Sequence, residues 1–299
     1  MTTTTQSIDI SQLPAPDVVE QLDYETILAR MLDKLVSIAP EMAGLSDSDP
    51  THKNLQVVAY RELLIRQRVN DAARAVMLAY ATGTDLDCLA QRRGITRQVV
   101  DPGDPEAIPP VPAVMEDDER LRHRIRVSPN GFSTAGPKGA YEFFALGASP
   151  RVKSADVDSP TRGCVAITVL SIDGDGTPDA ELLDVVSAAL SDDEIRPLTD
   201  WVTVQPAEIV DYTIVADLTL YPGPDSSVVL ATAQEALDKY VGDHHRLGHD
   251  ITLSGIYAAL HQPGVQRVEL TTPSADIVVS QTQAAYCTST TVTAGGTDV

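Results

Sequence analysis

Two short segments carry the side chains that could bind a metal ion. The first is the acidic turn Asp173-Gly174-Asp175-Gly176, whose carboxylates are the hard oxygen ligands that Ca²⁺ prefers. An EF-hand loop that starts at Asp173 needs glycine at its sixth position and glutamate at its twelfth, but these positions hold Pro178 and Asp184. We therefore interpret the segment as a turn followed by a helix cap.

The second segment is rich in histidine. His245 and His249 are four residues apart and lie beside His244 and Asp250, which would suit a transition metal if the segment were helical. Gly248 and the missing apolar periodicity favour a loop with solvated histidines instead. The sequence also has no Gly-x-Ser-x-Gly, Gly-x-x-x-x-Gly-Lys or His-Glu-x-x-His motif. It thus predicts no catalytic residue, no metal site and no cofactor.

The charge of the chain excludes two classes of partner. The 299 residues carry a formal net charge of −21, whereas nucleic-acid binding needs clustered Lys and Arg. The same charge opposes adhesion to an anionic membrane, and no apolar run approaches the ~20 residues that span a bilayer. The N-terminus has no basic segment followed by an apolar one, so no secretory signal is expected. Three widely separated cysteines indicate a reducing compartment rather than a disulfide framework.

The acidic turn lies within a block, Gly163 to Val204, that has the pattern of a strand, a turn, a helix and a second strand. The β-branched run before Ile172 predicts the first strand. Thr177 can cap the helix and Pro178 suits its first turn, because a proline there loses no hydrogen bond. The helix has an apolar face made by Leu182, Val185, Val186, Ala189 and Leu190.

A weaker version of this block recurs from Asp211 to Leu270. Alternation from Ile214 to Tyr221 predicts a strand with one covered face, and an apolar stripe from Val229 to Val241 predicts a helix. A short helix over residues 254–261 and a strand over 265–270 follow. Beyond Pro273 we expect an edge strand at residues 277–279 and then a loosely held terminus.

The N-terminal region is predicted to be helical. Helices are expected over residues 24–39, capped by Asp23, over residues 53–81, closed by Gly83, and over residues 86–92. The long helix has a heptad-like stripe of Leu55, Val58, Ile65, Val69, Ala72 and Val76. Such a stripe packs either against the chain's own core or against helices of other chains.

The segment DPGDPEAIPPVP, residues 101–112, contains five prolines and predicts an extended, stiff linker. Helices over residues 116–126 and 138–146 follow it. We therefore predict an α+β fold with an N-terminal helical region (1–98), a proline-rich linker (99–118), two small α/β modules (119–206 and 207–273) and a tail (274–299). A degenerate tandem repeat is one interpretation of the two modules.

Several segments together resemble one family. The stretch from Tyr60 to Asp87 resembles the N-terminal helical signature of the baseplate J-like proteins of contractile phage tails. Further similar segments occur in the same order along the chain: Ile8 to Val19, Pro150-Arg151-Val152, Asp173 to Pro178, and Arg196-Pro197-Leu198-Thr199-Asp200. The resemblance extends from about residue 8 to residue 273, and residues 280–299 lie beyond it.

The resemblance implies a non-enzymatic, structural baseplate wedge protein of a contractile phage tail or a phage-tail-like bacteriocin. It implies that the helical stripe bundles with a second wedge protein and that the α/β modules pair with other copies into a ring around the hub and spike. Other hub and sheath-initiating proteins are further implied partners, and rearrangement of the ring would trigger sheath contraction. The protein would be assembled in the bacterial cytoplasm and carried in the virion or tail-like particle. Arg196 to Asp200 serve as a structural marker of the family.

Two rival functions come from other classes. A tail-associated peptidoglycan hydrolase would need an acid, a base or a nucleophile gathered in a cleft, and scattered Ser, His and Asp residues leave that alternative open. A soluble binding module without an assembly role would remain alone in the presence of a wedge partner.

Overall fold

The computed structural model describes residues 16, 18–133, 135–193, 195–223 and 225–298. Residues 8–15, where the family resemblance begins, lie outside this part. The chain divides into two compact units. The first comprises residues up to Arg97 together with Asp117–Ile125, and the second comprises Gln98–Glu116 and Arg126–Val299.

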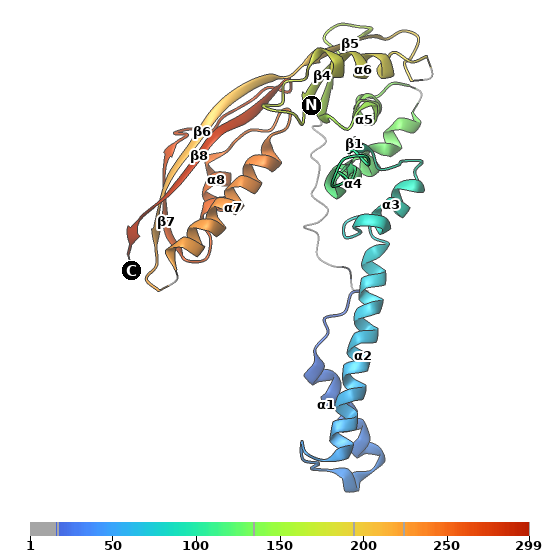
Figure 1. Cartoon of the computed structure of the whole chain (residues 1–299), viewed down its shortest axis with the longest axis vertical. Coiled ribbons are helices and arrows are strands. Elements are labelled where there is room, and N and C mark those ends of the chain that lie inside the picture. Colours follow the sequence, from blue (N-terminus) through green and yellow to red (C-terminus); the bar gives the residue numbers. More distant parts are fainter. Residues whose placement is uncertain (1–15, 17, 134, 194, 224, 299) are drawn as a thin grey trace. The chain divides into compact units, whose positions relative to one another are not determined.

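The first unit is helical (Figure 1). It contains α1 (Tyr24–Ile38), the short 3-10 helix η2 (Pro40–Met42), α2 (Pro50–Ala75), α3 (Gly83–Gln91) and most of α4 (Asp118–Val127). Asp23 caps α1 by accepting a hydrogen bond from the Thr26 backbone N–H at 2.8 Å, as predicted. Asp49 caps α2, whose first residue is Pro50.

The long helix is shorter at its C-terminal end than the sequence suggested. α2 ends at Ala75, and Gly83 is the first residue of α3 rather than the terminator of α2. The buried guanidinium of Arg122 explains this break, because it donates hydrogen bonds to the carbonyl oxygens of Leu78 and Ala81, each at 2.8 Å. Carbonyls that would otherwise continue the helix therefore have partners outside it.

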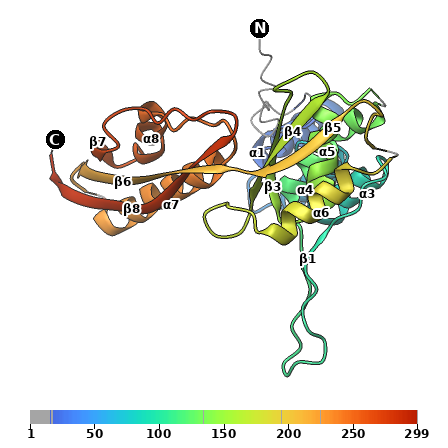
Figure 2. The same cartoon turned by 90° about the horizontal axis from the view of Figure 1, so that it is seen from above.

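The proline-rich segment does not run as an extended linker between its neighbours. It folds back as a hairpin with strands β1 (Val99–Asp101) and β2 (Val114–Met115), seen as a long narrow loop in Figure 2. At its base the backbone N–H of Glu116 donates to the carbonyl of Gln98 at 2.9 Å. The extended linker was predicted from the stiffness of the prolines alone. The chain instead turns at Gly103, whose φ of 66° is left-handed.

The central module has a three-stranded sheet in the order β3-β4-β5. Its elements are η3 (Ser128–Phe132), α5 (Lys138–Ala148), β3 (Val152–Asp158), β4 (Cys164–Ser171), α6 (Ala180–Leu190) and β5 (Trp201–Pro206). β4 and β5 are parallel and are joined through α6, so the predicted strand-turn-helix-strand unit is confirmed. Leu182, Val186 and Leu190 of α6 pack into the core under the sheet.

The C-terminal module has a second three-stranded sheet in the order β7-β6-β8. It contains β6 (Glu208–Leu220), α7 (Ser226–His244), α8 (Leu253–Leu260), β7 (Val265–Thr272) and β8 (Gln283–Thr297). Alternate residues of β6 from Tyr212 to Leu220 face the core that α7 and α8 cover. This confirms the predicted period-two strand.

The tail is part of this sheet rather than a loose terminus. β8 pairs in parallel with β6 along its whole length, whereas the apolar run at residues 277–279 makes only an isolated bridge between Ile277 and Ile251. β8 was missed because it is rich in Thr and Ser and lies at the sheet edge, where little apolar alternation is needed.

The predicted fold class, a helical region followed by two small α/β modules, is confirmed. In each sheet the central strand has one parallel and one antiparallel neighbour. The parallel neighbour of β4 follows it directly through α6, but that of β6 comes from the end of the chain. The tandem repeat therefore remains an interpretation.

Candidate interaction surfaces

The acidic turn is a structural element. Asp173 and Asp179 each accept a hydrogen bond from the guanidinium of Arg151, at 2.7 and 2.6 Å. Asp179 also caps α6 by accepting from the Leu182 N–H at 2.8 Å, and the bond from Arg151 lowers the pKa of its carboxyl. Asp175 accepts from the Thr177 N–H at 2.9 Å. The turn-and-cap interpretation is confirmed, but the cap is Asp179 rather than Thr177, and Pro178 lies before the helix instead of in its first turn.

The segment after His244 is a loop, as expected, but not all of its histidines are solvated. His244 ends α7, and His245 is buried, with Nδ1 2.8 Å from the carbonyl oxygen of Ala285. Burial lowers the pKa of His245, so its ring favours the neutral form, whereas His249 is exposed. Among the described residues no group of three or more His, Cys, Asp or Glu side chains is placed to hold a metal ion.

His245 belongs to a junction between the central and C-terminal modules. A small apolar cluster joins them, in which Leu170 of β4 packs with Leu247 and with Ala284 of β8. Gly176 lies directly against this junction, because a Cβ at that position would stand 2.8 Å from His245 Nε2. The acidic turn therefore positions one module on the other, which its sequence alone did not indicate.

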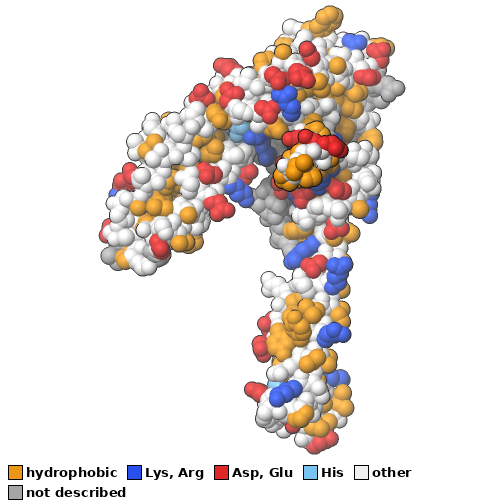
Figure 3. All heavy atoms as spheres, viewed as in Figure 1, with side chains coloured by type: hydrophobic (Ala, Val, Ile, Leu, Met, Phe, Trp, Pro, Cys, Tyr) orange, Lys and Arg blue, Asp and Glu red, His pale blue; other side chains and the backbone are white. Residues whose placement is uncertain are grey.

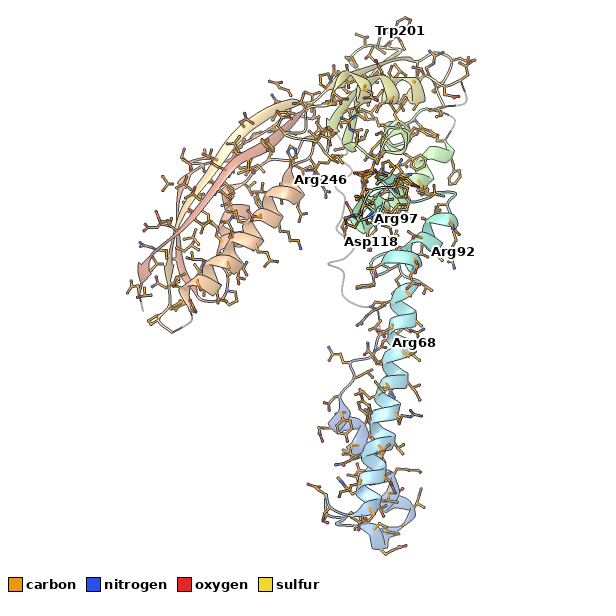
Figure 4. The ribbon with its side chains drawn as sticks, in the orientation of Figure 1. Arg68, Arg92, Arg97, Asp118, Trp201 and Arg246 are labelled. Carbon is orange, nitrogen blue, oxygen red and sulfur yellow. The ribbon has the colours of Figure 1, made fainter. Side chains whose placement is uncertain are left out.

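Lys153 lies at the same junction. Burial, together with the nearby positive charge of Arg246, lowers the pKa of its ammonium to about 8, and Asp243 opposes this only partly. Figure 4 labels Arg246 on the C-terminal module. The protonated lysine is therefore a destabilising element in this junction.

The predicted stripe on α2 is an apolar face of the first unit that no described element covers. At 100° per residue, the positions from Val58 to Val76 fall within about 60° of arc, which makes a narrow face. Val58, Ile65, Val69 and Val76 are 51%, 65%, 56% and 62% exposed. Ala72 is exposed as well, and Figure 3 shows apolar side chains along this helix.

Leu55 is the one predicted member that lies elsewhere. It packs with Ala59 and Leu63 against Ile27 and Leu28 of α1. Its position on the helix is about 70° from the centre of the stripe and closer to the direction of Ala59, so α1 covers it. The sequence pattern therefore combined two adjacent faces, one that packs within the chain and one that is exposed.

A network of charged groups fixes the end of α2 and the start of α3. Arg97 donates to Asp87 at 2.8 Å and to Asp118 at 2.6 Å, and Asp118 accepts from the N–H of Gly83 at 3.0 Å (Figure 4). Desolvation opposes ionisation of Asp118, but the bonds from Gly83 and Arg97 outweigh it and lower its pKa. Together with Arg122 these contacts connect the segment after α2 with α3 and α4.

The segment Arg196 to Asp200 forms a tied loop before β5. Arg196 donates to the carbonyl of Asp200 at 3.2 Å, and the hydroxyl of Tyr141 donates to the Asp200 carboxylate at 2.8 Å. The loop leaves Leu198 97% exposed and Trp201, the only tryptophan of the chain, 70% exposed (Figure 4). Trp201 is the first residue of β5, and nothing in the neighbouring sequence signals this exposure.

Three family models match successive parts of the chain. The baseplate J-like N-terminal domain matches residues 47–104, the central domain residues 133–206, and the C-terminal domain residues 212–293. The chain belongs to the baseplate J-like protein family. The N-terminal match includes the exposed stripe of α2, and the other two follow the central and C-terminal sheets.

A curated relative supports the same assignment. Baseplate protein J of Escherichia phage P2 is 50% identical over 298 residues, covering 97% of this chain and 99% of that protein. A chain of the six-fold symmetrised anti-feeding prophage (AFP) baseplate overlays with a TM-score of 0.42 at 18% identity, covering 60% of this chain and 44% of the other.

The baseplate J-like assignment confirms the family resemblance and the interpretation as a structural, non-enzymatic phage baseplate component. No enzymatic family is indicated, so the hydrolase alternative has no support from the comparisons. The chain therefore acts in association with other baseplate proteins. None of the helices in the described residues is long and apolar enough to cross a membrane.

Proposed function

We propose that this baseplate J-like chain is a wedge component whose α2 stripe bundles with helices of a second wedge protein. In this proposal, copies of the chain associate through their α/β modules into a ring around the hub and spike, next to the sheath-initiating proteins. Assembly takes place in the bacterial cytoplasm, and rearrangement of the ring triggers sheath contraction.

The exposed stripe is the observation that carries the proposal. Fully burying a Val or Ile side chain stabilises by about 1.5–3 kcal/mol, and the four large members of the stripe are each more than half exposed. A partner that covered them would gain roughly 4–6 kcal/mol before the costs of association. From Val58 to Val76 the stripe extends for ~27 Å, a length that suits a helix bundle.

Its geometry also supports a helical partner over a flat one. The stripe residues recur at intervals of three, four and seven, and a partner helix with apolar residues at the same intervals can pack against them along its length. Glu62 lies beside the stripe, about 50° from its centre, and is already paired with Arg66 at 2.7 Å on the same helix. The charge therefore does not have to be desolvated alone when a partner helix packs beside it.

The contraction step requires interfaces with two arrangements of similar free energy. A switch between such states needs a difference of only a few kcal/mol, which many small contacts can supply. The net charge of −21 supports a contribution of salt-sensitive contacts at the rim of these interfaces. If baseplates with charge-reversed surfaces contracted with unchanged salt dependence, this part of the proposal would be wrong.

Co-expression tests the wedge role directly. The full chain would be expressed with and without the second wedge protein encoded in the same gene cluster and then examined by size-exclusion chromatography with light scattering. We expect a stable hetero-complex that elutes ahead of either component. A chain that elutes unchanged in the presence of the other protein would contradict the proposal and would favour a free binding module.

A further inference from the structure

The two ends of the hairpin of residues 99–116 lie next to each other. At its base Gln98 and Glu116 exchange two hydrogen bonds, one from the Glu116 N–H to the Gln98 carbonyl and one from the Gln98 N–H to the Glu116 carboxylate, both at 2.9 Å. The hairpin can therefore be removed in principle without separating the flanking elements. Long irregular excursions of this kind in compact domains usually serve a function.

The hairpin has a defined conformation. Asp104 and Val111 bond through both backbone groups, at 3.0 and 2.9 Å, and Asp101 and Asp104 accept from the N–H groups two residues further on. A Cβ at Gly103 would stand 2.4 Å from the Val111 carbonyl oxygen, so only glycine allows this approach. Because five prolines further restrict the segment, little conformational entropy remains to be lost on binding.

The exposed side chains of the hairpin have one chemical character. Ile108 at the tip is 100% exposed, and the other exposed apolar residues are Val99, Val111, Val114 and Met115. Asp101, Asp104 and Glu106 lie among them, and residues 99–116 contain no Lys or Arg. The tip faces the reader in Figure 3, where apolar side chains border acidic ones. Within the described part of the chain, its apolar side chains belong to none of the four core clusters described above.

We propose that this hairpin inserts into an apolar groove, rimmed by Lys and Arg, on a different protein of the baseplate. A proline-rich, preformed segment fits an aromatic-lined groove, and a basic rim complements the three exposed carboxylates. A second copy of this chain is a poor occupant, because it has 43 acidic residues against 22 basic ones.

This inference rests on the proposed baseplate role but uses a surface separate from the α2 stripe. The hairpin tip falls between residues 47–104 and 133–206, which the N-terminal and central family models match. The docking role therefore does not follow from the family assignment.

Site-specific photo-crosslinking in assembled particles tests the inference. A benzophenone amino acid would replace Ile108 in the full chain, Val69 on the α2 stripe, or Val278, which is exposed but belongs to neither surface. Particles would be produced from the gene cluster that encodes the chain. We expect a strong crosslink from position 108 to a different baseplate protein, at a peptide that contains aromatic and basic residues, and a yield at least tenfold lower from position 278.

The other outcomes are separable. If position 69 crosslinks to a partner and position 108 crosslinks to nothing or only to copies of this chain, the hairpin proposal is wrong and the wedge proposal stands. If neither position crosslinks, both are wrong.

A substitution series gives a second readout. The amount of the hairpin's partner that is recovered with purified tails should fall at least tenfold with Ile108→Asp and stay near normal with Ile108→Val. Rising salt concentration should weaken the binding of this partner further. Unchanged recovery with Ile108→Asp would overturn the proposal.

Discussion

Replacing Arg122 with methionine should selectively destabilise the base of α2. The guanidinium is buried and donates to two backbone carbonyls, those of Leu78 and Ala81, and to Glu119 at 2.5 Å. A hydrogen bond from a charged group contributes about 1.5–3 kcal/mol, and each carbonyl left without a partner costs about 1–3 kcal/mol. We therefore expect Arg122→Met to lower the free energy of unfolding of the first unit by about 3–5 kcal/mol.

Pulsed hydrogen exchange with mass spectrometry across a urea series measures this change segment by segment. With a urea dependence of ~1.5 kcal/mol per molar for a unit of this size, the midpoint of peptides from α2 and α3 should fall by about 2–3 M. Peptides from β6 should keep their midpoint. Arg92→Met, at an exposed position, is the matched control and should shift neither transition by more than about 0.5 kcal/mol. A normal α2 midpoint in Arg122→Met, or an equal shift in β6, would refute the assigned role of Arg122.

Three further outcomes are expected. Lys153 has a pKa of about 8 in the folded chain and an ordinary value of 10.5, so between these limits the unfolded chain binds more protons and stability should rise as pH increases from about 8 to 10.5. Lys153→Met should flatten this rise in a series of thermal melts at different pH. Lys239→Met, at an exposed position, is the control and should preserve the rise. Gly176→Ala should destabilise the module junction by about 1–3 kcal/mol more than Gly174→Ala. Both glycines have a left-handed φ, but only position 176 lacks space for a Cβ. Equal melting temperatures for the two variants would contradict the assigned packing against His245. Tyr141→Phe should cost about 1 kcal/mol and loosen the loop before β5 in hydrogen exchange, since it removes the bond to Asp200, whereas Tyr221→Phe should have no such effect.

Local sequence signals sufficed for elements whose stabilising contacts lie nearby. The strand β4 was predictable because a β-branched run ends in a glycine turn, and α6 because an apolar face with helical spacing follows, although its cap is Asp179 rather than Thr177. The exposed stripe of α2 was predictable from its spacing, but spacing alone could not tell that Leu55 turns toward α1.

The missed features depend on partners distant in sequence. The end of α2 is set by Arg122, 41 residues beyond the Ala81 carbonyl that it binds. The burial of His245 follows from Ala285, 40 residues further along, and β8 is defined by its parallel pairing with β6. The hairpin was missed because its defining bond joins Asp104 to Val111 across a proline-rich loop whose composition resembles that of a linker.

The most direct test of the central claim is the affinity of the full chain for the second wedge protein when the α2 stripe carries charge. Ile65→Asp with Val69→Asp places two carboxylates in the proposed bundle and should weaken binding at least 100-fold by isothermal titration calorimetry. The circular dichroism of the free chain should not change, because both side chains are already exposed. Val228→Asp, on an α7 position of similar exposure, should bind as the original chain does. Full affinity in the stripe variant, or an equal loss in Val228→Asp, would contradict the assignment of α2 as the wedge-binding surface.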